Sequence, residues 1–275
     1  MASFLQTLIP LLSSTALLLA LATWPARGQT TSFTYDFYGS QPNDLTYQGD
    51  AHFSSDSTYL RLISTDASGN PLPKSAGRVL YTAPIQFWEE GAQVDLETTL
   101  KFIIKPNEGD TDPGDGLTFF IAPVGSAIGA AGGSFGIFDD SGKKPGVFAV
   151  EFDIYINSAV DPSYRHVGID IESQVSSNVT EVGDAILGQE VTARIDYEEA
   201  TKVISVHVTA GSKTFEVSYV YDLSTVLDQQ VQVGISASTG GKVATFEVIS
   251  WYFTSTLVHT TANSKEAGGN IRQVV

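Results

Sequence analysis

The sequence contains no cysteine, and its single methionine is the first residue. Without cysteine, the chain cannot use a disulfide framework, a catalytic thiol or thiolate metal ligands. Basic residues are also scarce, because 15 lysines and arginines stand against 31 acidic residues, for a formal net charge of −16. A nucleic-acid-binding surface needs a basic footprint, so nucleic acids and anionic membrane surfaces are not expected partners. Most of the acidity is expected to serve solubility.

Long apolar runs are missing except at the amino terminus. Residues Leu8 to Trp24 are mostly apolar, but Pro10 and two serines interrupt them. The tripeptide Ala26-Arg27-Gly28 that follows is a small-x-small cleavage signature and predicts a signal peptide over residues 1–28. The alternative is an uncleaved membrane anchor, although the run is short for a span. We therefore expect a protein of the secretory pathway, extracellular or vacuolar, without membrane insertion.

The residues that are plentiful are those of β-sheets. Hydrophobic residues make up 42% of the chain, and Val, Ile, Thr, Phe and Tyr recur throughout. Short segments alternate apolar and polar residues, and turn signals such as Asn70-Pro71 and Gly240-Gly241 separate them. This pattern predicts an all-β protein, an antiparallel β-sandwich. One short helical turn is expected from Asp222 to Leu227.

The strands are predicted over residues 33–37, 59–63, 79–81, 100–104, 117–122, 147–156, 167–171, 191–197, 203–208, 215–221, 231–236 and 246–253. No linker divides them, so residues 29–261 are expected to form one domain. Residues 262–275 are polar and predict a disordered carboxyl-terminal tail.

One acidic segment stands apart from the general surface charge. It runs from Glu151 to Asn157 and is followed by Asp161 and His166. Alternate residues of a strand share a face. One face is therefore predicted to carry Glu151, Asp153, Tyr155 and Asn157, and the other, turned to the core, Phe152, Ile154 and Ile156.

Carboxylates this close together repel one another unless a cation neutralises them. Glu151 and Asp153 would lie about 7 Å apart along a strand, and Asp161 can fold back onto them from the next loop. Oxygen ligands suit Ca²⁺, and the nitrogen of His166 suits Mn²⁺ or another transition ion. The segment therefore predicts a metal site, and the alternative is a solvated acidic strand with a chance histidine.

Six sequence blocks, taken in order, resemble those of the legume lectins. They are Ser32-Phe33-Thr34-Tyr35-Asp36-Phe37, Tyr47-Gln48-Gly49-Asp50-Ala51, Gly77-Arg78-Val79-Leu80-Tyr81, Asp115-Gly116-Leu117-Thr118-Phe119-Phe120-Ile121-Ala122-Pro123, Glu151-Phe152-Asp153 through His166-Val167-Gly168-Ile169-Asp170, and Trp251-Tyr252-Phe253-Thr254-Ser255-Thr256. No single block is specific, but their order over residues 32–260 is. On these blocks the sequence is identified as a member of the legume lectin family.

The resemblance implies a jelly-roll-like sandwich of antiparallel sheets that binds one Ca²⁺ and one Mn²⁺ beside a shallow sugar pocket. It assigns to Mn²⁺ the residues Glu151, Asp153, Asp161 and His166. It assigns to Ca²⁺ the residues Asp153, Asp161, Asn157 and the main-chain carbonyl of Tyr155.

The same resemblance implies which residues form the sugar pocket. Asp115 would accept hydrogen bonds from two sugar hydroxyls, Asn157 would donate to one of them, and the backbone N–H of Gly133 would donate as well. The ring of Tyr155 would stack on the apolar face of the sugar, which needs a few fixed polar partners and one flat wall. The bond between Gly114 and Asp115 is expected to be cis, as in the family.

The loop from Ser238 to Lys242 resembles the specificity loop of the family and favours mannose or glucose. The region aligns without a gap with mannose/glucose-binding members, so the backbone N–H groups of Gly241 and Lys242 would face the sugar. Lys242 departs from the small, acidic or amide residues that are commoner there. A second departure follows Glu172, where the sequon at Asn178 predicts a glycosylation site in a secreted protein.

The sequence thus predicts a non-catalytic lectin that depends on Ca²⁺ and Mn²⁺, has glycans and glycoproteins as partners, and assembles as a homodimer or homotetramer. One alternative is a storage or amylase-inhibitor-like defence protein of the same fold that has lost sugar binding. Another is a glycosidase that uses Glu151 and Asp153 as its carboxylate pair. The neighbouring Asn157, Asp161 and His166 are better ligands than catalysts, which disfavours the enzyme.

Overall fold

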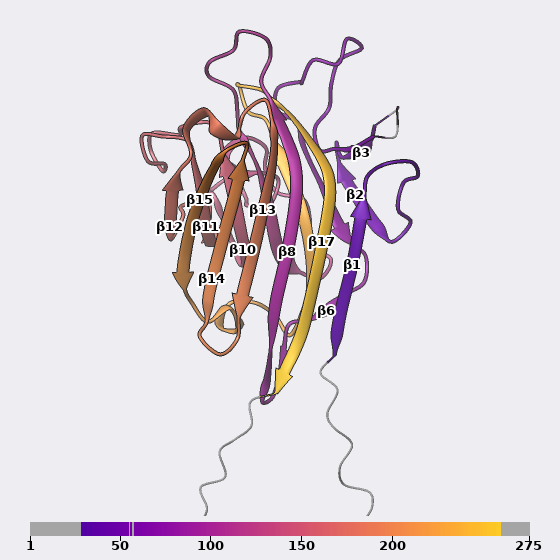
Figure 1. Ribbon diagram of the computed structural model, residues 1–275, viewed down its shortest axis with the longest axis vertical. Coiled ribbons are helices and arrows are strands. Elements are labelled where there is room, and N and C mark those ends of the chain that lie inside the picture. Colours follow the sequence, from indigo (N-terminus) through magenta and orange to yellow (C-terminus); the bar gives the residue numbers. More distant parts are fainter. Residues whose placement is uncertain (1–28, 55, 57, 260–275) are drawn as a thin grey trace, which may run out of the picture.

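The computed structural model describes residues 29–54, 56 and 58–259, and it folds them into two antiparallel sheets (Figure 1). The predicted antiparallel β-sandwich is therefore confirmed. The predicted signal peptide over 1–28 and the predicted tail over 262–275 lie outside the described residues. In the described part of the chain there is no α-helix, and so none that could cross a membrane.

The nine-stranded sheet faces the viewer in Figure 1. Its order is β15 (Lys213–Val220), β14 (Val203–Ala210), β13 (Glu190–Glu198), β8 (Ala92–Lys105), β17 (Thr245–His259), β4 (Leu60–Arg61) and β3 (His52–Phe53), with β1 (Thr30–Asp36) also pairing with β17 and β7 (Trp88–Glu89) with β8. Burial alternates residue by residue along β8 and β13, so this sheet turns one face to the core and one to solvent.

The eight-stranded sheet packs behind the first. Its order is β12 (Asn178–Glu181), β11 (His166–Ser173), β10 (Lys143–Asp153), β9 (Gly116–Pro123), β16 (Gln230–Ser238), β5 (Ala76–Tyr81) and β2 (Leu45–Gly49), with β6 (Ile85–Gln86) also pairing with β16. The 3₁₀ helices are η1 (Gly132–Ser134), η2 (Gly183–Ile186) and η3 (Leu223–Thr225). The last of these lies within the predicted helical turn at 222–227.

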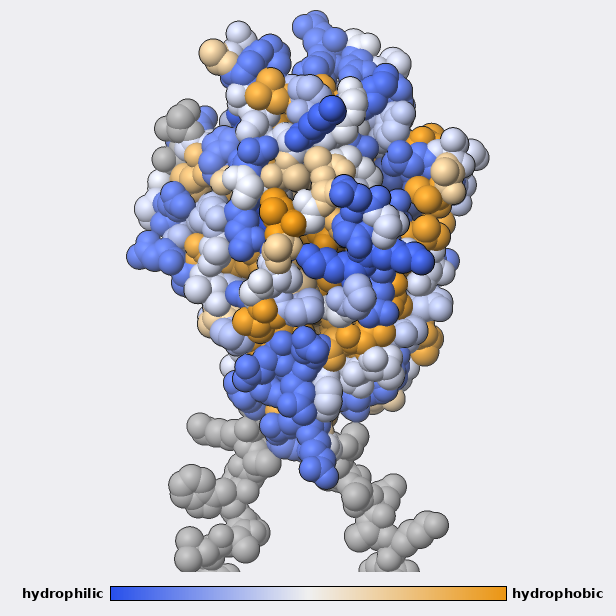
Figure 2. Space-filling view, turned by 180° about the vertical axis from the view of Figure 1, so that it is seen from behind, coloured by the Kyte–Doolittle hydropathy of each residue, from blue (hydrophilic) through white to orange (hydrophobic). Residues whose placement is uncertain are grey.

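The central strands of the eight-stranded sheet are buried on both faces. Phe119 and Val150 point into the main core between the sheets. Their neighbours Phe120 and Ala149 point the other way, into a second cluster that includes Phe135 and residues 137 and 138 from the loop after β9. Figure 2 views the molecule from the side opposite to Figure 1, where hydrophilic residues surround smaller hydrophobic patches. The loop after β9 therefore acts as a third layer.

The strand predicted over residues 147–156 begins earlier and ends earlier, because β10 spans Lys143–Asp153. Asp153 Oδ1 accepts the N–H of Tyr155 at 2.8 Å, which turns the chain out of the strand. Ile154 is buried as predicted, but Ile156 is 39% exposed, so its predicted place in the core is wrong. Tyr155 and Asn157 lie in the following loop and not on the strand face that carries Glu151.

Candidate functional site

The acidic residues of β10 meet a histidine on the neighbouring strand. Asp153 pairs with His166 in the register of β10 and β11, and Glu151 lies two residues back on the same face. One ligand atom from each of the three residues lies within 4.8 Å of the others, and all three side chains are buried. His166 Nε2 lies 2.9 Å from Glu151 Oε1. The predicted cluster is therefore assembled by strand pairing.

Burial and the neighbouring negative charges favour the protonated forms of Asp153 and Asp161. Burial raises the pKa of Asp153 well above its usual range, and the charges of Glu151 and Asp161 add to the shift. Burial also raises the pKa of Asp161. Burial alone would lower the pKa of His166, but its contact with Glu151 reverses the shift and raises it. A divalent cation would relieve this repulsion, because it favours the ionised carboxylates and competes with the imidazole proton.

The protein itself supplies little positive charge at this cluster. In the described part of the chain, neither lysine nor arginine forms an ion pair with Glu151, Asp153 or Asp161. None of the described residues donates a hydrogen bond to Glu151 Oε2, although that atom is buried. The donor set of carboxylates, one amide and one imidazole suits divalent cations such as Ca²⁺ and Mn²⁺.

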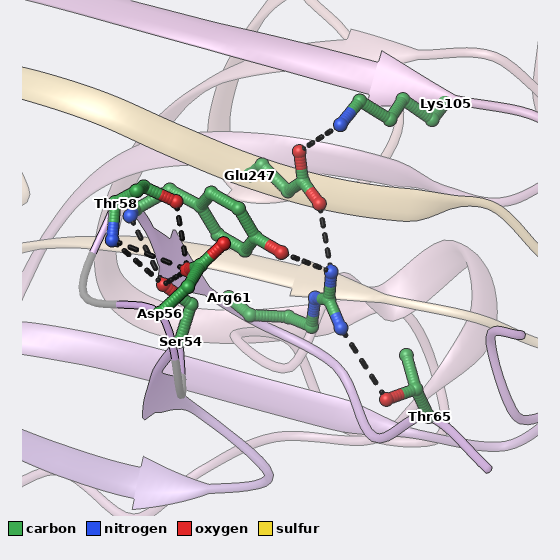
Figure 3. Close-up of polar contacts among 8 residues, drawn as sticks. Ser54, Asp56, Thr58, Arg61, Thr65, Lys105 and Glu247 are labelled. Atoms are coloured by element: carbon green, nitrogen blue, oxygen red, sulfur yellow. Dashed lines mark hydrogen bonds and ion pairs between the residues drawn. The ribbon is translucent and has the colours of Figure 1, made fainter. Parts of the chain in front are cut away.

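A second buried carboxylate, Glu247 on β17, has opposite surroundings (Figure 3). Arg61 Nη2 lies 2.8 Å from Glu247 Oε1, and the ammonium of Lys105 contacts Oε2. Arg61 also donates to the hydroxyl of Tyr59 at 2.7 Å. Here the fold supplies two cations for one carboxylate.

The loop after β10 returns its acidic residue toward the cluster. The backbone N–H of Asn157 donates to Asp161 Oδ2 at 2.5 Å, and the carbonyl of Asn157 accepts the Asp161 N–H at 2.9 Å. Arg165 holds the loop from its far end, because Nε donates to the carbonyl of Ile154 at 2.7 Å and Nη2 to that of Thr111 at 2.8 Å. These hydrogen bonds hold Asn157 and Asp161 beside each other in a loop that contains no helix or strand.

Asp115 is hydrogen-bonded to Ile154 at the start of this loop. The peptide bond before it is cis, as predicted. Its backbone N–H donates to the carbonyl of Ser238 at 3.1 Å, and its carbonyl accepts the Ile154 N–H at 2.9 Å. Its side chain is 4% exposed, and no described residue donates a hydrogen bond to Oδ2 within the usual geometry. Burial raises the pKa of Asp115 to about 6, while the Gly240 backbone N–H acts in the opposite direction.

Backbone close approaches bring the remaining predicted pocket residues together. A β carbon placed on Gly133 would lie 2.9 Å from Asn157 Nδ2, and one on Gly240 would lie 2.8 Å from Asp115 Oδ2. A β carbon on Gly114 would lie 2.9 Å from Cβ of Lys242 and 3.1 Å from Cβ of Tyr155. The absence of a β carbon lets the backbone of Gly240 approach the buried acceptor of Asp115, and lets Gly133 and Gly114 approach Asn157 and Tyr155. These approaches bring the predicted pocket residues Asp115, Gly133, Tyr155, Asn157 and Lys242 together around the loop that contains Gly240.

The loop from Ser238 to Lys242 reaches Asp115 through Gly240. Gly240, which was not among the predicted contacts, makes the close approach to Asp115, whereas a β carbon on Gly241 would have nothing within 4 Å. The Lys242 ammonium lies 2.8 Å from Asp112 Oδ2, so its side chain is paired at the rim.

Further residues at the site were missed by the sequence reasoning. Ser176 Oγ donates to Glu151 Oε1 at 2.5 Å and also lies 2.7 Å from Oδ1 of the buried Asp170. The burial of Asp170 and the charge of Glu151 raise the pKa of Asp170 well above the usual range.

Asn178, the predicted glycosylation site, is exposed on β12 at the sheet edge. Its Nδ2 donates to the carbonyl of Ser218 at 2.7 Å.

Comparison with known proteins finds the same fold and sequence pattern. The family model described as the legume lectin domain matches residues 30–268. Agglutinin-2 from Cladrastis kentukea is 36% identical over 270 residues, which cover 94% of this chain and 92% of that protein. The mannose/glucose-specific lectin from Centrolobium tomentosum is 34% identical over 243 residues, which cover 83% of this chain and 97% of that protein. The solved structure of the winged bean acidic lectin complexed with methyl-α-D-galactose is similar with a TM-score of 0.78 and 34% identity, and the match covers 84% of this chain and 100% of that one.

Proposed function

The chain belongs to the legume lectin family, and on that premise we propose that it is a Ca²⁺- and Mn²⁺-dependent lectin specific for mannose or glucose. Members of the family are non-catalytic carbohydrate-binding proteins, so the chain is a carbohydrate-binding protein and the glycosidase alternative is wrong. The proposal adds to this the two cations and the class of sugar.

The observation that carries the proposal is the buried oxygen of Asp115. Oδ2 is shielded from water, and within the described chain it receives no hydrogen bond of usual geometry. A buried acceptor left in this state is unfavourable by about 1–3 kcal/mol or more. Two adjacent hydroxyls of a sugar ring are donors that could satisfy this carboxylate, with Tyr155 beside it as the apolar wall.

The proposed metal ligands are close enough to Asp115 for the charges to interact, because the charge of Asp161 acts on Asp115 and that of Asp115 on Asp153. Glu151, Asp153, Asp161 and His166 would hold Mn²⁺, and Asp153, Asp161, Asn157 and the Tyr155 carbonyl would hold Ca²⁺. The ions would supply the positive charge that the carboxylates lack in the protein. Because Asn157 and Tyr155 would serve both the metal and the sugar, metal binding orders the groups that contact the sugar.

The mannose or glucose preference rests on the loop from Ser238 to Lys242, which aligns without a gap with mannose/glucose-binding members of the family. The mannose/glucose-specific lectin of Centrolobium tomentosum supports it at 34% identity. The winged bean acidic lectin, with its bound galactoside, is also 34% identical, and the competing prediction is therefore specificity for galactose. Mannose and glucose both differ from galactose in the orientation of the C4 hydroxyl, and the loop beside Asp115 is where that difference would be read.

A glycan-array titration of the purified mature protein, with and without EDTA, tests the proposal. Binding to mannose or glucose glycans that EDTA abolishes is the expected result. Galactoside binding would retain the lectin and overturn the proposed specificity. Failure to bind any glycan after loading with Ca²⁺ and Mn²⁺ would favour a storage or defence protein of the same fold that has lost sugar binding.

The proposal places the protein in the secretory pathway as a homodimer or homotetramer, with residues 1–28 removed. The domain over 29–261 would end in a free tail over 262–275. Asn178 is exposed, so an oligosaccharide could be attached there once its bond to Ser218 is released. Intact-mass measurement before and after deglycosylation tests the attachment, and sedimentation velocity tests the assembly.

A further inference from the structure

We infer that Thr239, a threonine that does not face the sugar, is a positioning residue for the sugar pocket. Its hydroxyl ties the loop from Ser238 to Lys242 to the segment Leu72–Ala76, which we call the buttress segment. The inference rests on the proposed sugar pocket, because it concerns how that pocket is held in shape. It assigns a binding role to a segment that lies outside every predicted contact.

The hydroxyl of Thr239 makes two bonds to the buttress segment. Oγ1 donates to the carbonyl of Leu72 at 2.6 Å and accepts the backbone N–H of Ser75 at 3.0 Å. The backbone repeats the link, because the Thr239 N–H donates to the Ser75 carbonyl at 2.8 Å. Thr239 is 0% exposed. The Thr239 hydroxyl is therefore shielded from water, and both of its hydrogen bonds are made within the protein.

The buttress segment is itself hydrogen-bonded to other parts of the fold. Ser75 Oγ donates to Asp50 Oδ2 at 2.6 Å and accepts the backbone N–H of Ser64 at 2.8 Å. The backbone N–H of Asp50 donates to the carbonyl of Ala76 at 3.0 Å, next to the pairing of β2 with β5. Thr239 thus connects the loop, through Ser75, to Asp50 and Ser64.

The two neighbours of Thr239 reach the pocket directly. The Ser238 carbonyl accepts the backbone N–H of Asp115 at 3.1 Å, and Ser238 Oγ donates to the carbonyl of Gly132 at 2.5 Å. On the other side, the Gly240 carbonyl accepts the Lys74 N–H at 3.0 Å. Gly240 also approaches Asp115 so closely that a β carbon there would lie 2.8 Å from Oδ2. A shift of Thr239 must therefore move the backbone beside the sugar acceptor.

None of these contacts involves the proposed metal ligands. The effect of losing the Thr239 hydroxyl is therefore expected on sugar binding and not on metal binding. A general loss of stability would not produce this separation, so the separation distinguishes positioning from ordinary packing.

The structure offers a matched control in Thr98 on β8. Thr98 is also 0% exposed, and its Oγ1 donates to the Tyr252 carbonyl at 2.7 Å and accepts Nε1 of Trp251 at 3.0 Å. It lies in the nine-stranded sheet, and its bonds do not touch a pocket residue. Thr239→Val and Thr98→Val each remove one buried hydroxyl with two bonds and preserve the side-chain shape.

The experiment is calorimetric titration of the full mature protein with Ca²⁺ and then with methyl α-D-mannoside, with methyl α-D-galactoside in parallel. We expect Thr239→Val to weaken binding of the preferred glycoside by about tenfold, or about 1.4 kcal/mol, with unchanged Ca²⁺ affinity. Thr98→Val should lower thermal stability to a similar extent without weakening sugar binding. Thr239→Ser keeps the hydroxyl and should restore wild-type affinity. The backbone amide resonance of Gly240 should shift in Thr239→Val and not in Thr98→Val.

Ser75→Ala provides a second route if Thr239→Val does not fold. It removes the bonds to Asp50 and Ser64, one step further from the pocket, and should weaken sugar binding in the same direction. Sugar affinity that is unchanged in Thr239→Val, or equally reduced in Thr98→Val, would overturn the inference alone. A wild-type protein that binds neither glycoside would overturn the proposed function and the inference with it.

Discussion

Two buried acidic clusters in this protein differ in where their counter-charge comes from. Glu247 contacts Arg61 and Lys105 within the chain itself. Glu151 and Asp153 are also buried, but among the described residues only His166, which contacts Glu151, could carry a positive charge beside them, and only when its ring is protonated. Burying a carboxylate without compensation is strongly unfavourable. The first cluster is therefore complete when the chain folds, whereas we propose that an external cation completes the second.

The largest expected effect is on sugar affinity, after a change in the cluster of Glu151, Asp153 and His166. Asp153→Ala removes a ligand proposed for both ions, so sugar affinity should fall by more than about 100-fold, as it should on chelation of the wild type. Glu247→Gln removes a buried carboxylate from the complete cluster and should lower stability while leaving sugar binding intact. Calorimetric sugar titration of both variants checks this. Equal losses of sugar affinity would mean that the two clusters do not differ in role.

The next effect separates the metal cluster from the buried acceptor beside it. Asp115→Asn keeps the shape but removes the charge that two sugar hydroxyls would contact. Hydrogen bonds to a charged group contribute about 1.5–3 kcal/mol, so sugar affinity should fall roughly 10- to 100-fold. Metal content by mass spectrometry should stay at the wild-type level. Loss of metal in this variant would place Asp115 among the ligands and contradict the assignment.

Removing the guanidinium of Arg61 should leave the buried Glu247 short of positive charge, as Glu151 and Asp153 are. In Arg61→Met, Glu247 keeps only Lys105, whose side chain is 49% exposed. The free energy of unfolding should fall by about 2 kcal/mol, less than for a fully unpaired buried charge. Lys101→Met breaks the exposed pair with Glu190 and should change stability by less than about 1 kcal/mol. Urea denaturation measures both, and similar values would remove the distinction between buried and exposed pairs.

The smallest expected effect is a pH dependence at the sugar acceptor. Burial raises the pKa of Asp115 to about 6, and the charge of Asp161 contributes. This carboxyl gains its proton as the pH falls through that value, so sugar binding should weaken below it and be complete above it. A cation beside Asp161 opposes this shift, so the fall should begin at lower pH when Ca²⁺ is saturating than when it is limiting. Sugar affinities measured across this range that do not change with pH would contradict the role of Asp115.

The fold could be predicted largely from alternation and turn residues. In strands such as β13, buried residues alternate with more exposed ones, and the sequence shows this as an alternation of apolar and polar residues. The alternation fails in β10, where residues 146–153 are all buried, because the loop after β9 covers its outer face. The end of that strand could not be predicted either, since it depends on the Asp153 side chain accepting the Tyr155 N–H.

The acidic residues of the site were predicted because their spacing is local. Glu151, Asp153 and His166 come together through one strand pairing. Gly240 and Thr239 were missed as contacts, because their partners Asp115 and Ser75 lie far away in the sequence. Arg165 was missed for a different reason, since an arginine in a loop carries no signal until its bonds to Ile154 and Thr111 are seen.

The most direct test of the central claim is a count of protons released when the metal-free protein binds Ca²⁺ and Mn²⁺. Titration calorimetry in two buffers of different ionisation enthalpy gives this number. Because the pKa values of Asp153 and His166 are raised in the cluster, metal binding should release protons, and the release should vanish in Asp153→Ala but persist in Glu247→Gln. Metal binding without proton release, or no metal binding at all, would contradict the account that this cluster is completed by external cations.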